Sequence, residues 1–226
     1  MCSPERASRT ASSISRQAGQ FDTQRVRAYS LSMRYSAEHK ARNHETIISA
    51  AARAFREHGS ESSGIGTVMK KVGLTKGGFY RHFESKDALF VRAVARAFEE
   101  MGTGMVDAAR SAPEGQALQA MIERYLSVRH ANSPGAGCVL AALAPEIARM
   151  PALVRKQIEV HLNAYRERLL PFVPGRTRDE RLATCRLLFS SMAGALMLAR
   201  VASDPHTQEA RLKEARNFFI KQFAER

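Results

Sequence analysis

The sequence predicts an all-α fold, with an N-terminal three-helix domain followed by a larger helical domain. Two observations carry this prediction. From about residue 36 onward, apolar residues recur at intervals of three and four, which is the spacing of one helix face. Capping residues, glycines and prolines also divide the chain into stretches of helical length, and no stretch shows the alternation of a half-buried strand.

Residues 1–32 are rich in Ser, Arg, Thr and Gln and show no sustained period. This composition predicts a disordered basic tail, because it offers little large apolar surface to bury. The segment also lacks the apolar centre of a secretory signal. An alternative is that natural translation starts at Met33, directly before the first expected helix.

The first domain is expected to begin with a helix that Ser36 caps and Gly59 ends. Two short helices follow, and Ser85 caps a longer helix whose end Gly102 and Gly104 loosen. In chain order, the expected helices after Gly59 are Ile65–Val72, Thr75–Phe83 and one that begins at Lys86.

Residues 41–101 and 102–226 are expected to be separate domains, and the second also has helical spacing throughout. Pro145 predicts a break or kink in a short helix that opens at Cys138. The expected helices are residues 113–131, the short helix from Cys138, Ala152–Phe172, Arg178–Ala202 and His206–Glu225.

The charge balance is strongly basic, with 35 Lys and Arg against 22 Asp and Glu, a formal net charge of +13. Such a balance favours a polyanionic partner, which means nucleic acid or an anionic membrane. Ordinary solubility gives the same balance, and the excess is spread along the whole chain. A nucleic-acid function must therefore be argued from local pattern.

No apolar run approaches the roughly 18–20 residues of a membrane span, so no membrane partner is expected. Cys2, Cys138 and Cys185 are too few and too scattered for a disulfide framework, and no Cys/His cluster has metal-ligand spacing. The sequence therefore predicts a cytoplasmic protein without a metal or other cofactor.

Residues 64–83 carry the most informative pattern. Ile65 to Val72 places one apolar face on a helix of two turns, Gly73 permits a tight turn, and Leu74 can anchor that turn in the core. Thr75 can then cap a second short helix. Two short helices joined through a glycine turn are typical of a helix-turn-helix, whose second helix enters the major groove of DNA.

The charge within this segment supports the same interpretation. Between Ser62 and Phe83 there are four Lys or Arg and no carboxylate, as suits a surface that approaches phosphates. Gly77 and Gly78 each cost about 1 kcal/mol of helix propensity. They are understandable if the backbone must come close to DNA, although relief of crowding against the preceding helix is an open alternative.

The run TKGGFYRHFESKDAL at residues 75–89, preceded by VMKKVGL and by a helix ending FREHG, closely resembles the DNA-binding domain of TetR/AcrR-type regulators. The resemblance covers about residues 41–90 and becomes vague after about residue 100. Met69, where a small residue is common, and the glycine-rich residues 63–66 depart from the family pattern.

The resemblance implies a sequence-specific transcriptional regulator, most simply a repressor on a palindromic double-stranded DNA operator. It implies a homodimer whose C-terminal domain binds an effector, either a small molecule or a reactive electrophile, that releases the DNA. The residues implied in DNA binding are Thr67, Thr75, Lys76, Gly77, Gly78, Tyr80, Arg81, His82 and Lys86.

These residues have different implied roles. Thr75 to Gly78 would lie near base edges and phosphates, and Tyr80 and His82 would contact phosphates. Lys86 would add charge at a helix N-terminus. Core packing of Tyr80 and His82, and a solvated role for Arg81, remain open.

The effector candidates lie in the second domain. Cys138 follows a glycine-rich loop at a helix N-terminus, where a thiol can become a reactive thiolate; a small buried core cysteine is the alternative. The polar candidates for a pocket among residues 105–172 are Tyr125, Glu146, His161 and Tyr165, each of which also has a surface or structural alternative.

The family forms a four-helix bundle between subunits from its last two helices. Apolar stripes occur on both of these helices here, with a small-residue stretch at residues 193–195, but a monomer core would give the same stripes. The stripe residues are Leu182, Cys185, Leu188, Phe189, Met192, Leu196 and Ala199, then Leu212, Ala215, Phe219 and Phe223.

Two other functional classes compete with a regulator. An enzyme is disfavoured, because the seven histidines are not accompanied by an HExxH, GxSxG or phosphate-loop motif, and no catalytic residue is assigned. A nonspecific architectural DNA-binding protein is the main alternative, since the basic charge is dispersed. A large preference for one DNA sequence over random DNA would distinguish a regulator.

Overall fold

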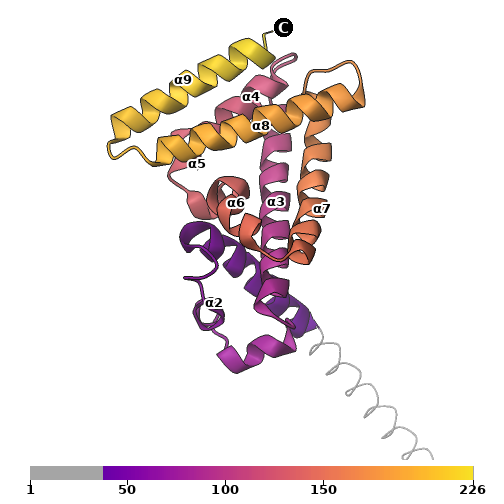
Figure 1. The fold of residues 1–226 in the computed structure, drawn as a ribbon, viewed down its shortest axis with the longest axis vertical. Helices are drawn as coiled ribbons and strands as arrows, with labels where there is room; N and C mark the ends of the chain where they lie inside the picture. Colours follow the sequence, from indigo (N-terminus) through magenta and orange to yellow (C-terminus); the bar gives the residue numbers. More distant parts are fainter. Residues whose placement is uncertain (1–37, 226) are drawn as a thin grey trace, which may run out of the picture. The chain divides into compact units, whose positions relative to one another are not determined.

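The computed structural model describes residues 38–225, and every regular element among them is a helix, as the sequence predicts (Figure 1). The predicted tail, 1–32, and the proposed cap Ser36 lie outside these residues. The chain divides into two parts, Met1–Thr46 and Ile47–Arg226. In the first part residues 38–46 are helical.

A helix over residues 47–58 opens this part and ends where Gly59 takes a φ of 77°, as predicted. Helix α2 (Ile65–Lys71) buries Val68 and Met69. The next element is not the expected α-helix, because η2 (Lys76–Arg81) is a short 3-10 helix. Two adjacent glycines of low helix propensity account for the weaker form.

Helix α3 (Lys86–Arg110) begins at the predicted cap, where the Ser85 hydroxyl accepts a hydrogen bond from the Ala88 N–H. The expected loosening at Gly102 and Gly104 is wrong, because α3 continues to Arg110. Because both glycines lack a Cβ, side chains from neighbouring helices pack closely against them. Since α3 runs through residues 101 and 102, the proposed boundary between 41–101 and 102–226 falls inside one helix and stays a prediction.

The rest of the chain is a set of helices with short connections: α4 (Ala117–Tyr125), α5 (Val128–Ala131), η3 (Pro134–Ala136), α6 (Val139–Arg149), α7 (Ala152–Leu169), η4 (Leu170–Phe172), α8 (Arg178–Arg200) and α9 (Pro205–Phe223). The expected single helix over 113–131 is wrong, because it breaks between α4 and α5. Of the break or kink expected at Pro145, the break is absent, since α6 continues through that residue. The kink stays a prediction.

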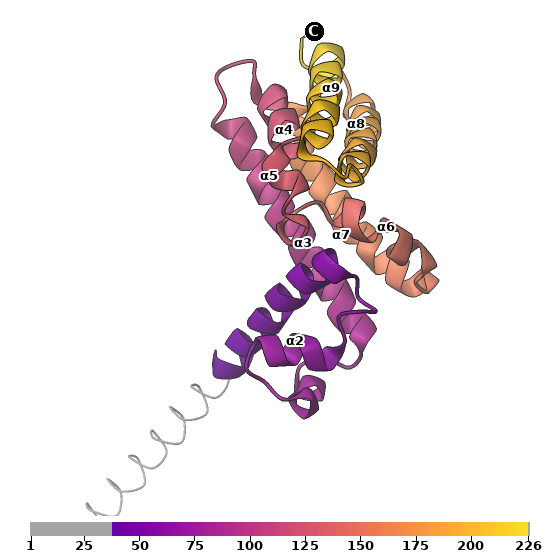
Figure 2. The ribbon, with the colours of Figure 1, turned by 90° about the vertical axis from the view of Figure 1, so that its left-hand side faces the viewer.

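Helix α3 packs against α4 and α7, and α8 packs against α6, α7 and α9 (Figures 1 and 2). Aromatic rings fill the space between these layers. Tyr165 of α7 lies between Phe98 and Phe189, with ring-centroid distances of 5.7 and 6.2 Å. Gly102 allows this approach, because a Cβ there would lie 3.2 Å from the Tyr165 ring.

Helix α8 is long and apolar enough to cross a membrane by length and composition alone, contrary to the expectation from the apolar runs of the sequence. Core helices of soluble proteins meet the same criterion. In this structure 39% of the apolar window is buried against other helices, so the finding is weak support for a span.

Candidate nucleic-acid interface and adjoining cavity

The turn between α2 and η2 depends on one glycine. Gly73 has a φ of 71°, in the left-handed region that side chains disfavour. Its N–H donates to the Lys70 carbonyl at 3.1 Å, and the Leu74 N–H donates to the Met69 carbonyl at 2.9 Å. Leu74 is partly buried against the core, as predicted, so both ends of the turn are fixed.

Two phenylalanines anchor η2 to the core. Phe79 and Phe83 are buried, and their rings stack at a centroid distance of 5.5 Å. Tyr80, the residue next to Phe79, turns outward and is 69% exposed. The anchor therefore fixes the inner face of η2 and leaves its outer face open to solvent.

The proposed DNA-binding residues are exposed to solvent to different degrees. Thr75 occupies the cap position of η2, but its side chain accepts no backbone hydrogen bond, so the predicted capping bond is absent. The exposed members of the set are Thr67, Thr75, Lys76, Gly77, Tyr80 and Arg81, and the half-buried ones are Gly78, His82 and Lys86.

The structure gives Gly77 and Gly78 no role in relieving crowding. A Cβ on Gly77 would meet nothing within 4 Å, and one on Gly78 would make ordinary contacts of 3.6 and 3.8 Å with Thr75 and Met69. Neither glycine has a positive φ. The fold itself therefore does not require glycine at Gly77.

Arg56 is a buried cation that sequence reasoning missed. Its guanidinium donates to the Ala52 carbonyl at 3.0 Å, to the Gly137 carbonyl at 3.1 Å and to Glu100 at 2.9 Å. Helical spacing places Arg56 on the face of the buried residues Ile48 and Ala52, which is a signal that the sequence contained. Through Arg56, the helix before the helix-turn-helix contacts both α3 and the start of α6.

Glu146 makes a second connection of the same kind. Its carboxylate accepts hydrogen bonds from the Ser60 hydroxyl and from the Ser60 N–H, the latter at 3.1 Å. Glu146 was an effector candidate, but in this structure its carboxylate ties α6 to the end of the helix over residues 47–58.

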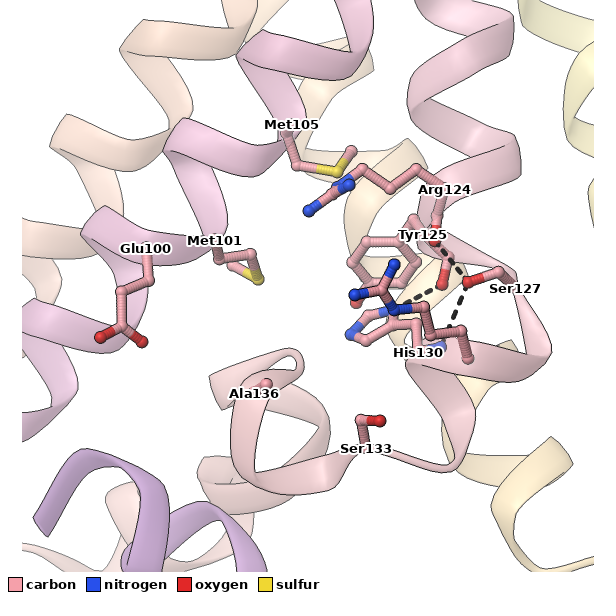
Figure 3. A pocket seen from close by; sticks show the side chains of 10 residues that line it. Glu100, Met101, Met105, Arg124, Tyr125, Ser127, His130, Ser133 and Ala136 are labelled. Atoms are coloured by element: carbon pink, nitrogen blue, oxygen red, sulfur yellow. Dashed lines mark hydrogen bonds between the residues drawn. The ribbon is translucent and has the colours of Figure 1, made fainter. Parts of the chain in front are cut away.

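A cavity of about 310 Å³ lies between α3 and the α4–α5 segment (Figure 3). Of the five effector candidates, only Tyr125 lines it; Cys138, Glu146, His161 and Tyr165 do not. The lining residues are Glu100, Met101, Met105, Arg124, Tyr125, Ser127, Arg129, His130, Ser133 and Ala136.

His130 connects the cavity wall to α6. Its Nδ1 lies 2.5 Å from the Tyr125 carbonyl, and its Nε2 accepts the Cys138 N–H at 2.8 Å. These partners assign the neutral tautomer that carries its proton on Nδ1. Burial lowers the pKa of His130, and the positive charges of Arg200, Arg124 and Arg56 lower it further, against the opposing effect of the Tyr125 hydrogen bond.

Cys138 is buried at the cap position of α6, where its sulfur accepts the Ala141 N–H at 3.4 Å. Cys185 is also buried, and burial raises the pKa of its thiol to about 11. Tyr165 is buried, and its hydroxyl has no hydrogen-bond partner within residues 38–225. Burial raises the pKa of Tyr165 and that of Tyr125. Among the described residues, no group of His, Cys, Asp and Glu could hold a metal ion.

The apolar stripe expected to pair subunits belongs largely to the subunit's own core. Most of its α8 members are buried, from Cys185 to Ala199. A different face of α8 is exposed, and a Cβ on Gly194 of this helix would meet nothing within 4 Å. The exposed large apolar residues of α8 and α9, with the adjoining Val201, are Leu187, Met197, Leu198, Val201 and Phe218.

Comparisons with known proteins agree with this geometry. The family described as "Bacterial regulatory proteins, tetR family" matches residues 47–93. An uncharacterized HTH-type transcriptional regulator of Mycobacterium tuberculosis is 27% identical over 80% of this chain and 96% of its own. An HTH-type transcriptional repressor of the same species is 34% identical over 27% of this chain and 32% of its own.

A solved structure shares the fold. The crystal structure of a TetR transcriptional regulator from Chloroflexus aurantiacus superposes with a TM-score of 0.65 and 22% sequence identity. The match covers 82% of this chain and 98% of the other. The helical architecture of this chain is therefore that of a known regulator, including the part where sequence similarity is weak.

Proposed function

Since this chain belongs to the TetR family of bacterial regulatory proteins, we propose that it is a cytoplasmic repressor that binds a palindromic operator as a homodimer. An effector in the C-terminal helices releases it from DNA. The observation that carries the proposal is the outer surface of α2 and η2. It is rigidly anchored by Phe79 and Phe83, basic, and free of carboxylates from Ser62 to Phe83.

The exposed residues of this surface have complementary roles. Thr75, Lys76 and Gly77 approach base edges and phosphates at the start of η2. Tyr80 extends its hydroxyl from an exposed ring to a phosphate. Arg81 adds a cation on the same element.

Thr67, Gly78, His82 and Lys86 complete the proposed interface. Lys86 is the first residue of α3, so its charge and the helix dipole act on the same phosphate. Thr67 is exposed on α2, and half-buried His82 is held at the end of η2 by its N–H bond to the Phe79 carbonyl at 2.8 Å.

A homodimer would use the exposed apolar face of α8 and α9. Leu198, Val201 and Phe218 are 65%, 76% and 59% exposed. We infer that they form one apolar patch, and such patches mark interaction sites. Gly194 allows a partner helix to approach closely. Two DNA-binding domains would then read half-sites about one helical turn of DNA apart.

The cavity and the DNA-binding part are joined by two residues. Glu100 lines the cavity and also accepts the hydrogen bond of Arg56. Arg56 in turn holds the Gly137 carbonyl, next to the cap of α6. A ligand that moves Glu100 would therefore change the position of the helix over residues 47–58.

The effector is either a small molecule in this cavity or an electrophile that reacts with Cys138. Burial of the Cys138 sulfur favours the small molecule. The electrophile mechanism predicts that Cys138→Ser abolishes release by N-ethylmaleimide, while Cys185→Ser retains it. Release that persists in Cys138→Ser excludes that mechanism.

Selection of binding sites from a random duplex pool tests the proposal. We expect one enriched palindrome, with protection of two half-sites by the full-length protein. Enrichment without a common sequence would favour the alternative, a nonspecific architectural DNA-binding protein.

A further inference from the structure

We propose that the cavity between α3 and the α4–α5 segment binds a small organic anion, whose carboxylate or phosphate group pairs with Arg124. This ligand would be the effector of the proposed function, so the inference rests on that function only for its consequence on DNA. The binding site itself is argued from the side chains that line the cavity.

Arg124 is placed for this role by the packing of two helices. Its side chain extends from α4 toward Met105 of α3, across the cavity from Glu100 (Figure 3). A Cβ on Gly104 would collide with the Arg124 guanidinium, so the glycine provides the room. Within residues 38–225, the Arg124 guanidinium has no hydrogen-bond or ion-pair partner.

Arg200 and Arg56, two other arginines near His130, are already bound. Arg200 donates to the Ala131 and His130 carbonyls at 3.0 and 3.2 Å. Arg56 donates to Gly137 and Glu100. Arg124 therefore differs from both, because it reaches the same place without an acceptor from the described part of the chain.

The cavity carries a surplus of positive charge. Its lining includes Arg124 and Arg129 but only one carboxylate, Glu100, which is engaged by Arg56. The lowered pKa of His130 also indicates positive charge here. Burial is its largest cause, and the charges of Arg200 and Arg124 lower it further. A cationic ligand would meet repulsion here, whereas an anion would neutralise unpaired charge.

The other residues that line the cavity indicate the size and the apolar part of the ligand. Guanidinium groups bind carboxylates and phosphates in a planar, bidentate manner. Met101, Met105 and the Tyr125 ring supply adaptable apolar surface beside Arg124. The volume of about 310 Å³ lies at the small end of ligand pockets, which favours a compact molecule with one apolar part and one anionic group.

The test measures binding to the full-length protein without DNA. Benzoate and phenyl phosphate are titrated by calorimetry and compared with benzamide, which has the shape of benzoate but no charge. We expect at least one anion to bind and benzamide to bind at least about tenfold more weakly. Equal binding of benzoate and benzamide, or no binding of either anion, overturns the proposal.

Three variants locate the site. Arg124→Gln removes the charge, and Gly104→Ala displaces Arg124 without removing it; both are expected to weaken anion binding at least about tenfold. Arg149→Gln removes an exposed arginine at the end of α6 and is expected to bind as the wild type does. Thermal unfolding without ligand shows that each variant folds, and unchanged affinity in Arg124→Gln contradicts the site.

Measurement of DNA binding separates this inference from the proposed function. If the anion binds through Arg124 but leaves DNA affinity unchanged, the site stands and its role as effector is wrong. If the protein selects no DNA sequence, the proposed function fails, whatever the calorimetry shows. The two anions distinguish a carboxylate ligand from a phosphate ligand.

Discussion

Arg56 donates a hydrogen bond to Glu100 at 2.9 Å, and this pair joins the helix before the helix-turn-helix to the wall of the cavity. The Arg56 side chain is 2% exposed, whereas that of Glu100 is 45% exposed. The buried partner therefore supports the fold, and the more exposed partner lines the cavity.

Replacement of Arg56 is expected to lower the stability of the fold. Arg56→Gln leaves the Gly137 carbonyl and Glu100 without their donor, and we expect the free energy of unfolding to fall by about 1–3 kcal/mol. Arg53→Gln, on the same helix but with an exposed side chain, removes a surface pair worth about 0–1 kcal/mol. Chemical denaturation measures both, and equal losses would contradict the role of Arg56.

Lys76 is expected to contribute charge to DNA binding. In Lys76→Gln, we expect weaker affinity and a decrease of about one in the slope of log affinity against log salt concentration. Lys213→Gln is the matched control, because Lys213 is exposed on α9. Fluorescence anisotropy at several salt concentrations provides the slopes. A slope unchanged in Lys76→Gln would remove this residue from the interface.

Gly77→Ala separates the fold from DNA binding. A Cβ at this position meets nothing within 4 Å, and alanine has the better helix propensity by about 1 kcal/mol. We therefore expect the melting temperature to stay level or rise while DNA affinity falls. An alanine variant that binds DNA as the wild type does would show that no close approach occurs there.

His130 is expected to make stability depend on pH. Because its folded pKa lies below the ordinary 6.5, the unfolded chain binds more protons in the interval between the two values. Stability is therefore fully present above about pH 6.5 and declines as the pH falls through that interval. Protonation also removes the acceptor of the Cys138 N–H.

The control for this prediction is His130→Gln, which keeps an acceptor but does not titrate. We expect the wild type to lose melting temperature more steeply than the variant between about pH 7 and pH 5. Parallel curves for the two proteins would contradict it.

The proposed subunit interface is tested by a charge on its exposed face. Leu198→Glu is expected to shift the protein from dimer to monomer in sedimentation velocity, because it buries an unpaired carboxylate between apolar helices. Leu153→Glu is the control, since Leu153 is 70% exposed on α7, outside that face. A dimer that survives Leu198→Glu would place the interface elsewhere.

The sequence was sufficient for the fold class and for the helix-turn-helix, because their signals are local. The turn at Gly73 and the helix cap at Ser85 were predictable, because both depend on hydrogen bonds to residues only three positions away. The 3-10 form of η2 was not predicted, although Gly77 and Gly78, whose low helix propensity accounts for it, stand in the sequence. Gly102 and Gly104 were wrongly predicted to loosen the end of their helix. Only the tertiary structure shows that side chains of neighbouring helices pack against both glycines.

The cavity was harder to predict because it depends on contacts far apart in the chain. Arg124 and His130 face it only because α4 ends at Tyr125 and α5 turns the chain back. Glu146 was singled out as polar, yet its partner Ser60 lies 86 residues away. A subunit-pairing stripe likewise cannot be told from a core stripe until the neighbours of α8 are known.

The most direct test of the account is the affinity of the full-length protein for its selected palindrome and for a base-shuffled duplex of equal length, at one physiological salt concentration. We predict a preference of at least about 10³ for the palindrome. Equal affinity for the two duplexes would contradict sequence-specific regulation by the surface of α2 and η2.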